Sequence, residues 1–179
     1  LSDHIPEDWL VISARGPVNV GANQFKWFEI AHSEGVVSVD VESEGKARRH
    51  VQGFMDQTIR AHGADASRIV VAGFSQGATL TMNLFLTQPE AYIGAGAFSG
   101  RVMDEIKPHI APKDTLAGKP VFLGFGSQDP FIPQAHATQT EDTLSALGLK
   151  VSTSYDDVGH NISGKHWMEF VSYLSGLAR

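Results

Sequence analysis

Short apolar runs of strand length alternate along this chain with stretches that have the periodicity of amphipathic helices. The strand-like runs cover residues 9–14, 69–72, 92–98, 121–125 and 150–155. The helical stretches cover residues 43–61, 78–87 and 133–147, and a last one whose apolar face carries Trp167, Phe170, Val171, Leu174 and Leu177. Alternating strands and helices with short connections are typical of a mostly parallel central sheet with helices on both faces. We therefore predict an α/β fold.

The length and charge of the chain limit what such a fold can be. With 179 residues, no internal repeat and no linker-like tract, we expect a single domain over residues 1–179. The net charge of -6 gives no general attraction to nucleic acid or to an anionic membrane. No apolar run reaches the roughly 20 residues of a membrane helix, so we expect no stable membrane insertion. Cysteine is absent, which excludes a cysteine nucleophile and suits a reducing, cytoplasmic location.

The strand-like run at 69–72 ends in the segment Gly73-Phe74-Ser75-Gln76-Gly77. Gly-x-Ser-x-Gly between a strand and a helix is the pattern of a nucleophile elbow, although a chain with 18 glycines leaves a chance match open. In this tight turn, glycines avoid a steric clash and the Ser75 hydroxyl is pushed into the open. The turn also places the Gln76 N–H at a helix N-terminus, where an anion is favoured, so we predict this N–H as an oxyanion donor.

A serine nucleophile needs a base, and His160 is the candidate. It follows the run at 150–155 in a glycine turn, where strand ends of a parallel sheet gather their functional groups. For the other histidines we predict surface positions: His4, His32, His50, His62, His109, His136 and His166.

The base in turn needs an acid that orients it. Asp129 follows the run at 121–125 and precedes Pro130, and a simple turn is the alternative interpretation of this Asp-Pro pair. Serine, acid and histidine would then follow the chain order of α/β-hydrolases. Asp156 is a weaker candidate for the acid because it lies so close to His160 in the sequence.

Several segments together resemble the carboxylesterase/phospholipase family of the α/β-hydrolase superfamily, which includes the acyl-protein thioesterases. They are Gly-Phe-Ser-Gln-Gly at 73–77, Gly-Ser-Gln-Asp-Pro-Phe-Ile-Pro at 126–133, Gly-His-Asn-Ile at 159–162 and Trp-Phe-Glu-Ile at 27–30. The resemblance runs from about Val11 to the C-terminus. It implies an α/β-hydrolase fold with Ser75 as nucleophile, Asp129 as orienting acid and His160 as base, and it implies no cofactor and no metal.

The expected activity is hydrolysis of small-molecule carboxylic esters with short to medium acyl chains, through an acyl-enzyme on Ser75. Thioesters and lysophospholipids remain open as substrates, and a homodimer remains open as the assembly. The alternatives on the same fold are an acyltransferase and a non-catalytic binding protein. Trp27, Phe131 and Ile132 are candidates for contact with the substrate, with ordinary packing as the alternative.

One segment of the family pattern has no counterpart here. The family carries a His-Gly pair before the strand that matches residues 9–14, and it supplies a second oxyanion N–H. The only His-Gly pair in this chain is His62-Gly63, which ends a predicted helix. We therefore hypothesise that Leu1 is not the natural start and that one or more strands of the sheet precede it.

Overall fold

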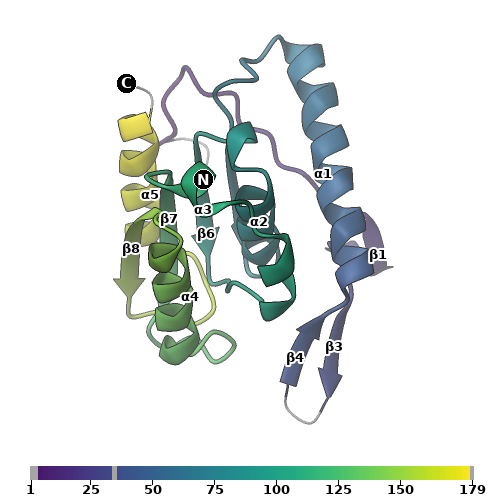
Figure 1. The fold of residues 1–179 in the computed structure, drawn as a ribbon, viewed down its shortest axis with the longest axis vertical. Helices are drawn as coiled ribbons and strands as arrows, with labels where there is room; N and C mark the ends of the chain where they lie inside the picture. Colours follow the sequence, from purple (N-terminus) through teal and green to yellow (C-terminus); the bar gives the residue numbers. More distant parts are fainter. Residues whose placement is uncertain (1–3, 34–35, 178–179) are drawn as a thin grey trace.

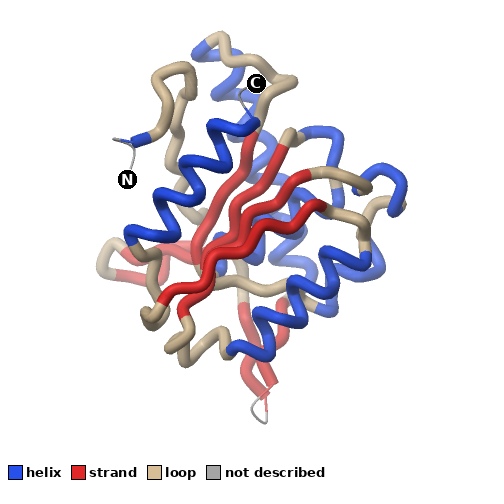
Figure 2. The backbone as a smooth tube through the Cα atoms, turned by 90° about the vertical axis from the view of Figure 1, so that its left-hand side faces the viewer, coloured by secondary structure: helices blue, strands red, loops and turns tan. Residues whose placement is uncertain are grey.

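The computed structural model describes residues 4–33 and 36–177 and contains a central sheet of four parallel strands. In spatial order these are β5 (Val70–Phe74), β6 (Gly94–Phe98), β7 (Pro120–Gly126) and β8 (Lys150–Asp156). Figure 2 shows the four strands side by side. The predicted α/β fold with a mostly parallel sheet is confirmed.

Four longer helices surround this sheet. They are α1 (Val41–His62), α2 (Gln76–Thr87), α4 (Gln134–Ala146) and α5 (Gly164–Leu177). The segment between β6 and β7 and the turn after α2 contain only short helices, η2 (Pro89–Ala91), η3 (Asp104–His109) and α3 (Lys113–Leu116). The helices predicted from the apolar periodicity therefore exist, with ends shifted by a few residues.

The two faces of the sheet carry separate clusters of buried side chains. On one face, Val121 and Leu123 of β7 pack with apolar side chains of α1, α2 and α4. On the other face, Phe122 packs with Phe170 and Leu174 of α5. Successive residues of a strand point to opposite faces, so a strand covered on both sides is a continuous apolar run. This is why the central strands were recognisable in the sequence.

Two small antiparallel hairpins lie between the N-terminal segment and α1. One pairs β1 (Val18–Gly21) with β2 (Gln24–Lys26), and the other pairs β3 (Ile30–Ser33) with β4 (Val36–Val39). The hairpin of β3 and β4 projects from the body of the molecule in Figure 1. The chain between β2 and β3 runs past the start of α2, which brings residues 27–28 close to the end of β5.

The strand predicted over residues 9–14 does not form, and that prediction was wrong. Leu10, Val11 and Ile12 are 50%, 49% and 41% exposed. A strand is stable only when a neighbour pairs with its backbone groups, and in the described part of the chain no strand pairs with this run.

Among the described residues, the strand β5 lies at an edge of the sheet and pairs with β6 alone. Ser75 N bonds to Phe98 O at 2.8 Å, and Ile93 N bonds to Ile69 O at 2.9 Å. The backbone N–H and C=O groups of the odd-numbered residues along β5 therefore point toward β6. The backbone groups of Val70, Ala72 and Phe74 consequently point away from the sheet. The hypothesis of strands preceding Leu1 concerns chain outside the described residues and remains a hypothesis.

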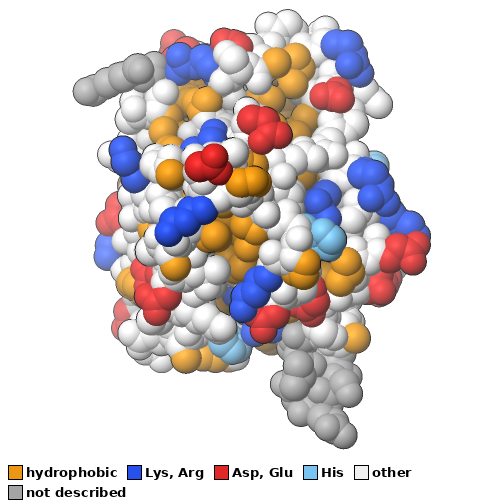
Figure 3. All heavy atoms as spheres, viewed as in Figure 1, with side chains coloured by type: hydrophobic (Ala, Val, Ile, Leu, Met, Phe, Trp, Pro, Cys, Tyr) orange, Lys and Arg blue, Asp and Glu red, His pale blue; other side chains and the backbone are white. Residues whose placement is uncertain are grey.

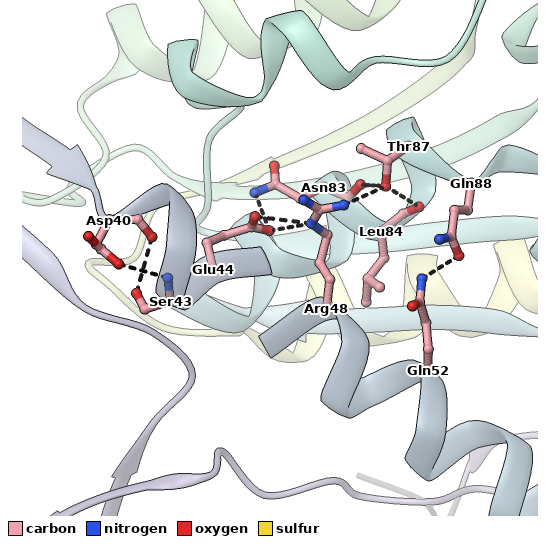
Figure 4. Close-up of polar contacts among 9 residues, drawn as sticks. All are labelled: Asp40, Ser43, Glu44, Arg48, Gln52, Asn83, Leu84, Thr87 and Gln88. Atoms are coloured by element: carbon pink, nitrogen blue, oxygen red, sulfur yellow. Dashed lines mark hydrogen bonds and ion pairs between the residues drawn. The ribbon is translucent and has the colours of Figure 1, made fainter. Parts of the chain in front are cut away.

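Polar contacts hold α1 alongside α2 (Figure 4). The buried Glu44 accepts hydrogen bonds from Arg48 Nε and from Asn83 Nδ2 of α2, each at 3.0 Å. Gln52 of α1 donates to Gln88 at the end of α2. A buried charge is tolerated only when it is paired in this way, so these contacts define how the two helices align.

The surface mixes charges of both signs. On the face shown in Figure 3, Lys and Arg side chains alternate with Asp and Glu, and hydrophobic side chains are visible between them. Among the helices of the described residues, none has the length and apolar character needed to cross a membrane.

Candidate active site

Ser75 sits in a strained turn between β5 and α2. Its φ is 54° and its ψ is -118°, a conformation that costs a non-glycine residue about 1–3 kcal/mol. A Cβ atom added to Gly73 would lie 2.3 Å from Gly77 O, so only glycine fits at position 73. The sequence pattern thus predicted the local geometry of this turn, which presents the Ser75 hydroxyl at the carboxyl end of β5.

The His160 ring lies between Ser75 and Asp129. His160 Nε2 is 2.9 Å from Ser75 Oγ, and His160 Nδ1 is 2.7 Å from Asp129 Oδ2. The carboxylate accepts the Nδ1 proton, which leaves Nε2 free to accept the hydroxyl proton of Ser75. Three side chains from the ends of β5, β7 and β8 therefore form one chain of hydrogen bonds. Their chemical roles remain predictions.

Asp129 is buried, with 5% of its surface exposed. Its Oδ1 accepts hydrogen bonds from Phe131 N at 2.8 Å and from Ile132 N at 3.0 Å. Burial raises the pKa of this carboxyl, but the bonds from His160 and from the two backbone N–H groups together lower it below its ordinary value. Asp129 is thus held as a carboxylate facing the imidazole.

Asp156, the weaker candidate for the acid, faces elsewhere. Its Oδ1 accepts from Asp157 N at 3.0 Å. Hydrogen bonds from Ser163 and from the Asp157 backbone lower its pKa. Asp129 is accordingly the carboxylate in contact with His160.

The backbone N–H of Gln76 begins α2 directly after Ser75. Within the described residues it donates no hydrogen bond, as the proposed oxyanion role requires of it. The Gln76 side chain is engaged, because Oε1 accepts from Trp27 N at 2.7 Å and Nε2 donates to Phe28 O at 2.8 Å.

Two exposed phenyl rings flank the His160 ring. The centroid of Phe74 lies 4.8 Å from that of His160, and the centroid of Phe131 lies 5.0 Å from it. Phe74 is 37% and Phe131 is 70% exposed. Sequence reasoning named Phe131 but missed Phe74, although its place directly before Ser75 was a usable signal.

The three predicted substrate contacts do not gather at one point. Phe131 lies against His160, whereas Trp27 and Ile132 are half-buried and pack against the larger core cluster. Trp27 also lines a groove between the N-terminal segment and α1.

One histidine prediction was wrong. His166 was expected at the surface, but it is fully buried and its Nε2 bonds to Phe125 O at 3.1 Å. It lies on the side of α5 that faces β7, since a Cβ atom added to Gly124 would lie 3.5 Å from His166 Cγ, and this position explains the burial. In the described part of the chain, no group of three or more His, Asp or Glu side chains could hold a metal ion.

Comparison with known proteins supports a specific family. The model of the family described as phospholipase/carboxylesterase matches residues 12–177. Acyl-protein thioesterase 1 of Eremothecium gossypii is 30% identical over 176 residues, which are 91% of this chain and 74% of that protein. Acyl-protein thioesterase 1 of Kluyveromyces lactis is 32% identical over 169 residues, or 88% of this chain and 71% of that protein.

Solved structures share the fold. The Bacillus cereus carboxylesterase superposes with a TM-score of 0.75 at 23% identity, covering 91% of this chain and 73% of that one.

Proposed function

The chain belongs to the phospholipase/carboxylesterase family of ester hydrolases, and we propose that it cleaves carboxylic esters through an acyl-enzyme on Ser75. The observation that carries this proposal is the position of the His160 ring, 2.9 Å from the Ser75 hydroxyl and 2.7 Å from the Asp129 carboxylate. A serine paired with a base that is oriented by an acid is the arrangement required for nucleophilic catalysis.

The proposed reaction has two halves. Ser75 Oγ attacks the ester carbonyl while His160 Nε2 takes the hydroxyl proton, and the Asp129 carboxylate stabilises the imidazolium. The Gln76 N–H and the N-terminus of α2 stabilise the oxyanion. His160 then gives its proton to the leaving alcohol, and the acyl-enzyme forms. A water molecule, activated by the same imidazole, releases the acid and restores Ser75.

The substrate class is a carboxylic ester or thioester with a short to medium acyl chain. The exposed rings of Phe74 and Phe131 beside His160 offer apolar surface to such a chain. Two matched relatives are named acyl-protein thioesterases, which favours including thioesters. Activity on a panel of p-nitrophenyl esters from acetate to octanoate would rank the acyl chains that the site accepts.

Replacement of Ser75 by Ala tests the nucleophile. Ser75→Ala should abolish the burst of p-nitrophenol from p-nitrophenyl butyrate and should abolish labelling by a fluorophosphonate probe. Ser127→Ala is the matched control, because Ser127 lies at the end of β7 but bonds to Asp157 rather than to His160. An undiminished burst in Ser75→Ala would remove Ser75 from the role, and failure of the folded wild type to be labelled would favour a non-catalytic binding protein.

A further inference from the structure

The Gln76 side chain connects the proposed nucleophile turn to a distant segment of the chain. Its amide accepts from Trp27 N and donates to Phe28 O, at 2.7 and 2.8 Å, and the partners lie 49 and 48 positions away in sequence. The one amide group thus holds the bend at residues 27–28 at two points, accepting from one backbone N–H and donating to the next backbone C=O. Such two-point pairing fixes orientation as well as distance.

No other hydrogen bond in the described part of the chain joins residues 27–28 to α2. The next residue, Glu29, is held by α1 and its N-cap instead, through Ser43 Oγ and Asp40 N. Without the Gln76 amide, none of the described hydrogen bonds would therefore link the backbone at Trp27 to the turn that carries Ser75.

Trp27, whose backbone N–H bonds to Gln76, also has its side chain next to α2. Its indole is close to the backbone of α2, because a Cβ atom added to Gly77 would lie 3.5 Å from Trp27 Nε1. The same side chain lines a groove whose other walls include Ala14, Val51 and Phe54. Phe28 is 1% exposed and anchors the segment in the core, but its burial alone leaves the direction of the Trp27 ring undetermined.

We propose that the Gln76 side chain is a positioning residue, which holds Trp27 as a fixed wall beside the Ser75 turn and thereby helps to select longer acyl chains. This inference rests on the proposed function. The same residue would thus act twice: its backbone N–H faces the oxyanion, and its side chain shapes the substrate path.

Gln76→Met tests the side chain, since methionine has a similar length but makes neither hydrogen bond. We expect the ratio of kcat/KM for p-nitrophenyl octanoate to that for the acetate to fall roughly tenfold, mainly through KM, because two neutral hydrogen bonds are lost. Gln52→Met is the matched control. It removes a side-chain amide bond between α1 and α2 and should leave the ratio unchanged.

A double-mutant cycle shows whether Gln76 acts through Trp27. If it does, Gln76→Met combined with Trp27→Ala should lower the octanoate-to-acetate ratio no further than Trp27→Ala alone. Additive losses, or an unchanged ratio in Gln76→Met, would overturn the proposal.

A second readout separates this inference from the hydrolase proposal. In a Trp9→Phe, Trp167→Phe background, Trp27 is the only tryptophan, and its quenching by acrylamide reports how firmly it is held. Gln76→Met should increase the quenching constant relative to Gln52→Met, even if the protein turned over no ester. Equal quenching in the two variants would refute the positioning role whatever the activity.

Discussion

At the scale of single residues, strain and burial converge on the proposed site. Ser75 keeps a positive φ of 54°, and Asp129 keeps a buried carboxylate that accepts three hydrogen bonds. Both features cost free energy that the surrounding packing must supply. A residue held in this way has little freedom to reorient, which suits a group that must meet a substrate in one geometry.

Asp129→Asn should show how much the orienting acid contributes. Asparagine keeps the shape but cannot stabilise the imidazolium, so we expect kcat for p-nitrophenyl butyrate to fall by about 10³–10⁴ with KM little changed. Asp156→Asn serves as the control and should retain most activity, because Asp156 does not contact His160. A larger loss in Asp156→Asn would mean that the acid has been misassigned.

At the scale of elements, β5 has the uncharged, apolar composition of a strand inside a sheet but lies at an edge of the described sheet. Its residues Val70–Phe74 include no charge, whereas β8 at the opposite edge begins with Lys150 and alternates polar residues. Edge strands with open backbone groups and no charge pair readily with other chains. Ala72 is the exposed residue at the middle of this open edge.

Ala72→Lys should therefore reduce self-association of this chain. A lysine on an open edge disfavours pairing with a second strand, while a change at an exposed position should alter stability by no more than about 0.5 kcal/mol. Light scattering over a concentration series would measure the effect. Ser152→Lys is the control, because it adds the same charge at an exposed position of β8, the other edge strand. If Ser152→Lys reduced self-association as much as Ala72→Lys does, the added charge and not its place on β5 would explain the effect.

At the scale of the whole molecule, one buried histidine links stability to pH. Burial lowers the pKa of His166, while the bond to Phe125 O and the charges of Asp156 and Glu169 partly oppose this effect. The neutral ring is fully used, because Nε2 donates to Phe125 O and Nδ1 accepts from Ser163 N. Protonation of Nδ1 would turn it into a donor facing the Ser163 N–H, which is also a donor, so this hydrogen bond would be lost.

The free energy of unfolding should fall as the pH drops below about 6.5, where the histidine of the unfolded chain takes up a proton more readily than the folded one. His166→Gln should be less stable at pH 7 by about 1–3 kcal/mol, through imperfect replacement of the buried bonds. Between pH 7 and pH 5, its free energy of unfolding should also fall less than that of the wild type. Urea unfolding at several pH values measures both effects, and the exposed His50→Gln should keep the wild-type slope.

The sequence by itself determined the features that depend on neighbouring residues in the chain. Apolar periodicity identified the central strands and helices, and the glycines around Ser75 required a tight turn. The order of Ser75, Asp129 and His160 along the chain was also visible, because each residue follows a strand whose end had to lie at the same edge of a parallel sheet.

Only the tertiary structure decided which neighbours each segment meets in space. The run at 9–14 has strand-like residues but pairs with none of the described strands, and β5 has the composition of an inner strand but lies at an edge of the described sheet. The burial of His166 and the bonds of the Gln76 side chain to residues 27–28 likewise depend on distant chain. Which strand pairs with which, and whether an individual polar side chain such as that of His166 becomes buried, depend on contacts between distant parts of the chain that no short segment contains.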